Sequence, residues 1–178
     1  MKIIVISYSL TGNNEALAKS VAEEFAAEHI KITEPKPRNT GSIMLDMIFN
    51  KTPQVQPTPD KLDNYDLVLF VGPVWMGQVA APLRAYLKHL KTNPGRYAFI
   101  SISGGAINTN PKLAGELKKR SGKEPIALID QHIADLLPSD PKPTMKTTSA
   151  YRLNDGDMKK LTDTIVKTLK ETISKTEV

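Results

Sequence analysis

Hydrophobic runs alternate with amphipathic segments along most of this chain of 178 residues. Lys2–Tyr8 contains four consecutive β-branched side chains, and Asp66–Val71 is hydrophobic after its first residue. Continuous rather than alternating hydrophobicity indicates strands that are buried on both faces, as in a parallel sheet. We therefore predict strands at both segments. Further strands are predicted at His29–Thr33, at Arg96–Ile102 and from Pro125–Ile129 onward.

Between these strands, hydrophobic side chains recur at helical spacing. In Glu15–Glu28 they stand every four residues, which predicts a helix with one apolar stripe. Ala81–Leu90 has Pro82 near its start, and proline suits the first turn of a helix. Comparable patterns predict helices at Pro111–Arg120 and Asp155–Ile173, with a shorter one at Ser42–Phe49.

Strands and helices in alternation predict an α/β fold. The arrangement expected is a doubly wound five-stranded parallel sheet with helices on both faces, joined by right-handed crossovers. The length suits one domain, and we find no internal repeat and no convincing boundary, so residues 1–178 are predicted to form a single domain.

In such sheets, ligands bind beyond the carboxyl ends of the strands. The first strand is followed there by Ser-Leu-Thr-Gly-Asn-Asn. A phosphate dianion needs backbone N–H groups, hydroxyl donors and the positive end of a helix dipole, and this segment offers all three. A helix cap needs only one polar residue, so the polar cluster favours a phosphate site. The candidate binding residues are Ser9, Leu10, Thr11, Gly12, Asn13 and Asn14, with side-chain donors on Ser9, Thr11, Asn13 and Asn14.

The kind of phosphate ligand follows from missing patterns. No lysine follows Gly12, as a nucleotide triphosphate loop would require, and the dinucleotide pattern GxGxxG is missing. A monophosphate site without metal remains. The chain has no cysteine, and the spacing of His29, His89 and His132 is not that of metal ligands, so no metal site is predicted.

Two later segments at the same edge of the sheet suit a flat ring. Trp75 could stack on a heteroaromatic ring beside the polarizable Met76, although a single tryptophan is often a core residue instead. Two glycines after the fourth strand would let the backbone approach a planar ligand, although they could also form an ordinary turn. The candidate residues are Pro73, Val74, Trp75, Met76 and Gly77, then Ser103, Gly104 and Gly105.

Composition narrows the class of partner. The net charge of +5 comes from scattered basic residues, and aromatic residues make up only 6%, which argues against nucleic-acid binding. No stretch approaches the ~18 apolar residues of a membrane span. The first residues, MKIIVISYS, lack a cleavage site and are interpreted as a strand rather than a signal peptide. The expected location is the cytoplasm.

Together these segments resemble the flavodoxin family. Ser9–Asn13 looks like the family's phosphate loop, Gly72–Gly77 like its first flavin loop, and Ser103–Gly105 falls where the second would be. Asn14 stands where a threonine is usual. The resemblance covers nearly the whole chain and implies one FMN, with its phosphate on the first loop and its ring between Trp75 and the third.

The resemblance implies electron transfer through FMN, to a redox partner protein or a small-molecule acceptor. The first alternative is an NAD(P)H-dependent FMN or quinone reductase on the same fold, and the second is a non-redox module for a phosphorylated ligand. No catalytic side chain is predicted, since the cofactor would supply the chemistry. Monomer and homodimer both stay open. The proline-rich Leu136–Leu153 could cover the flavin, form a dimer contact or be a surface excursion.

Overall fold

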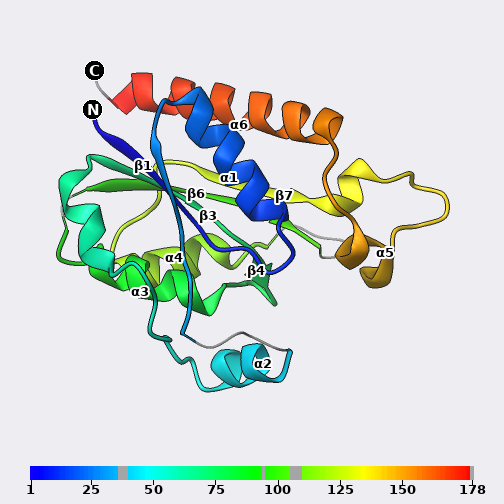
Figure 1. Ribbon diagram of the computed structural model, residues 1–178, viewed down its shortest axis with the longest axis horizontal. Helices are drawn as coiled ribbons and strands as arrows, with labels where there is room; N and C mark the ends of the chain where they lie inside the picture. The colour runs from blue at the N-terminus through cyan, green and yellow to red at the C-terminus, as the bar shows by residue number, and fades with distance from the viewer. Residues whose placement is uncertain (36–39, 94, 105–109, 177–178) are drawn as a thin grey trace.

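The computed structural model describes residues 1–35, 40–93, 95–104 and 110–176 (Figure 1). Its centre is a five-stranded parallel sheet in the order β2-β1-β3-β6-β7. This confirms the predicted doubly wound α/β fold. The strands are β1 (Ile3–Ser7), β2 (Glu28–Lys31), β3 (Leu67–Val71), β6 (Arg96–Ser103) and β7 (Leu128–His132).

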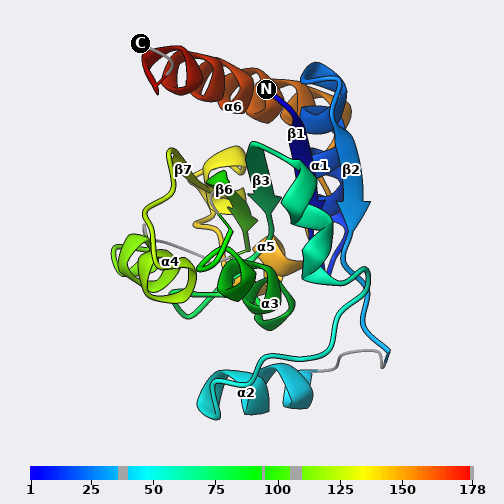
Figure 2. The ribbon, with the colours of Figure 1, turned by 90° about the vertical axis from the view of Figure 1, so that its left-hand side faces the viewer.

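Helices cover both faces of the sheet, as Figures 1 and 2 show. α1 (Asn13–Glu24) and α6 (Asp155–Thr176) lie on one face, and α3 (Ala81–His89) and α4 (Leu113–Ser121) lie on the other. No helix in the described parts of the chain has both the length and the apolar character needed to cross a bilayer.

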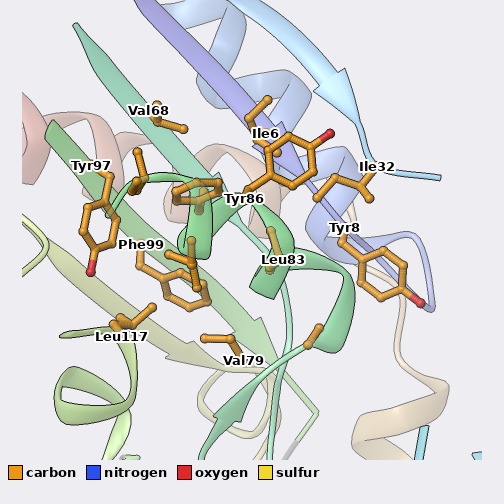
Figure 3. Packing of buried hydrophobic residues seen from close by; sticks show 14 of the residues in the cluster. Ile6, Tyr8, Ile32, Val68, Val79, Leu83, Tyr86, Tyr97, Phe99 and Leu117 are labelled. Atoms are coloured by element: carbon orange, nitrogen blue, oxygen red, sulfur yellow. The ribbon is translucent and has the colours of Figure 1, made fainter. Parts of the chain in front are cut away.

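The continuous hydrophobic strands divide their side chains between these two faces. From β1, Ile4 and Ile6 pack with the α3 and α4 side, whereas Val5 packs with α1 and α6. Figure 3 shows part of the first cluster, with Tyr97 and Phe99 among its rings. In this cluster Phe70 meets Tyr97 edge-on at 5.9 Å between ring centroids. The central strands β1, β3 and β6 are therefore covered on both faces, which explains why they lack a polar alternation.

Two buried tyrosines close the α3 and α4 side. Tyr86 donates a hydrogen bond to the carbonyl of Pro57, and the Tyr97 hydroxyl lies 3.0 Å from the Oγ of Ser121. Burial raises the pKa of each phenol to about 12, because a phenolate would lose its hydration there. Both rings therefore stay neutral over the physiological pH range.

Several boundaries differ from those predicted. α1 begins two residues early, at Asn13, and ends at Glu24, because Ala26 adopts a left-handed φ of 46°. Glu28 consequently belongs to β2 rather than to the helix. β7 begins only at Leu128, three residues after Pro125.

The irregular segments contain elements that hydrophobic spacing did not predict. A hairpin of β4 (Val74–Trp75) and β5 (Gln78–Val79) follows β3. The others are the 3-10 helices η1 (Pro59–Asn64) and η2 (Ile133–Leu136) and the short helix α5 (Met145–Ala150). α2 (Thr40–Ile48) matches the predicted short helix and lies away from the sheet, beyond α3 (Figure 2).

Candidate functional site

The direction in which successive strands join the sheet reverses between β1 and β3. The chain continues from β1 to β2 on one side and from β3 to β6 on the other, so the loops after β1 and β3 diverge. A cavity of about 340 Å³ lies at this point. Its lining consists of Leu10, Thr11, Asn14, Pro73, Val74, Trp75, Met76, Ile102, Gly104, Ile133, Met145, Thr148 and Ser149.

All three predicted loops contribute to this cavity, which the sequence could only place at the same sheet edge. None of the described residues that line it carries a charge, and most are apolar. An apolar cavity with a few polar groups is typical of a cofactor site, and the volume lies within the usual range of ~300–1,000 Å³. A larger hollow of about 630 Å³ lies at the opposite edge, around the amino ends of β3 and β6, far from these loops.

The loop after β1 is held in shape by its own groups. Ser9 Oγ accepts a hydrogen bond from the N–H of Gly12 at 3.0 Å, and Gly12 adopts a φ of 95° as the residue before α1. The first helical bond runs from the N–H of Ala16 to the Gly12 carbonyl. The N–H groups of residues 13–15 therefore lie at the positive end of the helix without an acceptor inside it. The exposed Thr11 adds a hydroxyl at the cavity.

The side chains of the two asparagines in this loop bond to distant segments of the chain. Both side chains are turned into the protein, with exposed fractions of 4% for Asn13 and 3% for Asn14. Asn14 donates to the carbonyl of Ile102 at 2.9 Å and accepts from the Ile102 N–H at 3.1 Å. Asn13 donates to the carbonyl of Tyr151 at 3.0 Å and accepts from the N–H of Leu153 at 3.2 Å.

These contacts use one of the two N–H donors of each amide, so donation of the other to a phosphate stays a prediction. Each amide satisfies one N–H and one carbonyl of a distant backbone segment, which is a structural role. Asn13 and Asn14 can still offer their own backbone N–H groups, because these precede the first helical bond. Their part in ligand binding stays a prediction.

The hairpin after β3 presents its turn to solvent. Met76 and Gly77 have φ values of 51° and 77°, the positive pair that a tight two-residue hairpin turn requires. Met76 is 82% exposed, whereas Trp75 is half-buried and meets Tyr8 edge-on at 6.2 Å between centroids. Trp75 therefore combines the two roles considered for it, since it packs against the core and also lines the cavity.

The loop after β6 is only partly described. Ser103 is buried, and its Oγ lies 3.0 Å from Nδ1 of His132. The other ring nitrogen of His132, Nε2, lies 3.5 Å from a carboxylate oxygen of Asp130. Gly104 lines the cavity, and Gly105 lies outside the described residues. Ser103 therefore faces β7 and supports the loop, while Gly104 reaches the cavity.

A fourth wall comes from the Leu136–Leu153 connection and from η2 before it, where the sequence interpretation left a cover over the flavin open and predicted no helix. α5 brings Met145, Thr148 and Ser149 to the cavity, and η2 adds Ile133. The buried Thr148 donates a hydrogen bond to the carbonyl of Gly104, which joins α5 to the loop after β6. Part of the proline-rich Leu136–Leu153 connection is thus a wall of the site.

One sequence signal could have located α5. Thr144 caps it, with its side chain accepting from the N–H of Thr147 while Thr147 bonds back to the N–H of Thr144. A threonine followed three residues later by a second hydrogen-bonding side chain indicates a helix start. Nothing in the sequence indicates, however, that this helix packs on the loop after β6.

The acidic residue that follows the loop after β1 is neutralised by lysines that do not line the cavity. Glu15 in the first turn of α1 pairs with Lys31 at 2.7 Å and with Lys19 at 3.7 Å. The hydrogen bond from Lys31 is the main reason that the pKa of Glu15 is lowered. Within the described ranges, no three histidine or acidic side chains gather as a metal site would need.

Comparison with known proteins agrees with this geometry. Residues 1–121 match the family described as NADPH-dependent FMN reductase. A flavoprotein from Lactobacillus acidophilus NCFM, solved in complex with FMN, is 25% identical with a TM-score of 0.60, over 73% of this chain and 93% of that one. A proposed flavoprotein from Bacteroides eggerthii DSM 20697 is 17% identical with a TM-score of 0.61, over 84% and 94%.

The family match covers well over half of the chain, and it confirms both the flavodoxin-like resemblance and FMN as the flavin. The likeness to the Bacteroides protein bears on the fold alone. The chain belongs to the NADPH-dependent FMN reductase family.

Proposed function

We propose that this protein is a reductase that holds one FMN in the cavity at the β1–β3 switch point and reduces it with a nicotinamide dinucleotide. The observation that carries the proposal is the meeting of Thr11, Trp75 and Gly104, from three separate loops, around one uncharged cavity. The family match supports a reductase rather than the carrier that the sequence first suggested.

The residues present fit FMN at both of its ends. Its phosphate would meet the backbone N–H groups of Asn13 and Asn14 and the hydroxyl of Thr11, which makes no hydrogen bond to any other described residue. Neutral donors at a helix N-terminus can hold a phosphate without a cation. The ring would lie against Trp75, where the lining is apolar.

When bound, FMN supplies hydride and electron transfer. The protein's own contribution is binding, orientation and exclusion of water. Trp75 is fixed by its edge contact with Tyr8, and Gly104 is fixed by Thr148, so both sides of the ring site are preorganised. Because no charged side chain lines the described cavity, we propose no catalytic acid or base.

An anaerobic spectroscopic titration tests the function. We expect the flavin absorption bands to shift when FMN is added to the purified protein, and to bleach when NADPH follows. Flavin that binds but is not bleached by NADPH would favour an electron carrier that needs a separate reductase. A protein that never takes up FMN would contradict the cavity assignment and favour a module for another phosphorylated ligand.

A further inference from the structure

A trough with several lysines runs beside the flavin hairpin. It consists of a hollow of about 580 Å³ along α4 and the hairpin turn, and a second of about 260 Å³ between α3, α4 and the segment after α2. We call the two together the α4 trough. Its basic lining residues are Lys112, Lys119 and Arg120 from α4 and its start, and Arg84, Lys88 and Lys91 from α3 and its end.

The α4 trough adjoins the flavin cavity at the turn of the hairpin. Met76 lines both the cavity and the first hollow, while Asn50, Lys119 and Arg120 line both hollows of the trough. A ligand with one end over the flavin could therefore pass Met76 and extend along α4. Lys112 and Lys119 are seven residues apart, which places them about 10 Å apart along the helix axis and on nearly the same side.

The fixed cations form the base of this trough. Arg84 is buried and donates to the carbonyls of Asp46 and Lys51, both at 3.1 Å, and to Gln78 of the hairpin at 2.9 Å. Arg120 pairs with Glu116 and donates to Asn50 at 2.7 Å. The second hollow is therefore held between α3, α4 and the segment after α2.

Three lysines at the rim of the trough have no ion-pair partner among the described residues. Lys88, Lys91 and Lys119 are exposed, line the second hollow, and form no ion pair with any described residue. No acidic residue lines that hollow among those described, and Thr52 and Asn50 provide polar groups there. Ammonium groups gathered around a hollow without a counter-charge favour a compact anion of high charge, such as a phosphate.

We propose that the α4 trough seats the phosphate groups of the dinucleotide electron donor, with Lys88, Lys91 and Lys119 binding the phosphate on its adenosine ribose. This assignment rests on the proposed function for the identity of the ligand. It names the residues by which the chain distinguishes NADPH from NADH, since only NADPH carries that third phosphate. A concave seat of this size suits a small phosphorylated molecule better than the broad surface of an acidic protein.

Calorimetric titration of adenosine 2′,5′-bisphosphate against adenosine 5′-monophosphate tests the seat directly, without FMN turnover. We expect the bisphosphate to bind the native protein about tenfold more tightly at low salt, and the triple variant Lys88→Gln, Lys91→Gln, Lys119→Gln to lose this preference. The matched control removes the same charge from α6, as Lys160→Gln, Lys167→Gln, Lys175→Gln, and should keep it. Rising salt should reduce the preference in the native protein.

Turnover gives a second measurement. In the rim triple variant the KM for NADPH should rise about tenfold, while kcat and the KM for NADH stay unchanged. Equal binding of the two adenosine ligands by the native protein would overturn the proposal, as would a rim variant that behaves like the α6 control. Inorganic phosphate binding as tightly as the bisphosphate would also overturn it, because the seat would then serve the free ion.

The two proposals fail separately. Lysine-dependent binding of the bisphosphate with no bleaching of FMN by NADPH would contradict the reductase and support the nucleotide seat. Bleaching by NADPH that is insensitive to all three lysines would support the reductase and overturn the seat. Circular dichroism and the thermal midpoint of each triple variant, compared with the native protein, exclude misfolding as the cause.

Discussion

Two walls of the proposed flavin cavity differ in how the chain builds them. The first consists of the loop after β1 and the β4–β5 hairpin, and its geometry comes from neighbours in sequence, such as Gly12 with Ser9 and Met76 with Gly77. The second consists of the end of β6 and α5, which come together across more than forty residues through Thr148 and Gly104.

The walls are joined by side chains that look like ligand contacts in the sequence. Asn14 joins the start of α1 to the end of β6, and Asn13 joins it to the residues that follow α5. A polar cluster at a binding loop can therefore serve two purposes at once. Backbone groups and Thr11 face the cavity, while the amides hold the walls together.

The largest effect on stability is expected from removing the side-chain hydrogen bonds that connect the two walls. Asn14→Ala leaves the buried N–H and carbonyl of Ile102 without partners and should lower the free energy of unfolding by about 2–4 kcal/mol. Urea denaturation measures this, with the exposed Asn64→Ala as the control, for which a change within about 0.5 kcal/mol is expected. Equal losses in the two variants would show that the join contributes little.

A substitution at Thr148 would weaken only the second wall, in which α5 contacts the end of β6. Thr148→Val keeps the shape but removes the hydroxyl that donates to Gly104, so we expect a loss of about 1–2 kcal/mol in stability and several-fold weaker FMN binding. The control is Thr164→Val on the exposed side of α6, where the hydroxyl bonds only within its own helix. Unchanged FMN affinity in Thr148→Val would mean that α5 is not part of the flavin site.

A pair of glycines tests the local wall. Gly12→Ala puts a side chain at a φ of 95° and should cost about 1–2 kcal/mol while weakening FMN binding, although nothing lies within 4 Å of the new atom. Gly115→Ala in α4 also meets open space, but at an ordinary helical position, and should stabilise by about 0.5–1 kcal/mol. Chemical denaturation of both variants gives the sign of each change in the free energy of unfolding. The same sign in both variants would contradict the explanation from the positive φ of Gly12.

The smallest effect is a pH dependence beneath the local wall, where His29 lies 2.8 Å from Ser7 at the end of β1. Burial is the main cause that lowers the pKa of His29 from its usual 6.5. The unfolded chain then takes up the proton first, so this contribution to stability is present above pH 6.5 and is lost as the pH falls below it. The free energy of unfolding, measured by denaturation at pH values from 7.5 to 5, should fall less steeply with falling pH for His29→Gln than for the native protein. An identical dependence on pH in the two proteins would rule out His29 as the source.

Much of the fold was predictable, because burial on both faces leaves a continuous hydrophobic strand such as Lys2–Tyr8 and a one-sided helix such as Asp155–Ile173. The hairpin at Gln78 and the helix α5 were not predicted, since two-residue strands and a six-residue helix are too short to show a period. The loops after β1, β3 and β6 were found because their polar and glycine residues follow a strand directly.

The sequence by itself determined the order of strands and helices along the chain, the three candidate loops and the uncharged character of the predicted phosphate loop. Those properties depend on near neighbours along the chain, where spacing and residue type suffice. Only the tertiary structure decided that the amides of Asn13 and Asn14 bond to protein backbone, that α5 completes the cavity, and that lysines from α3 and α4 share one trough. Such contacts join segments far apart in the chain, and no local pattern records which buried backbone group a side chain will satisfy.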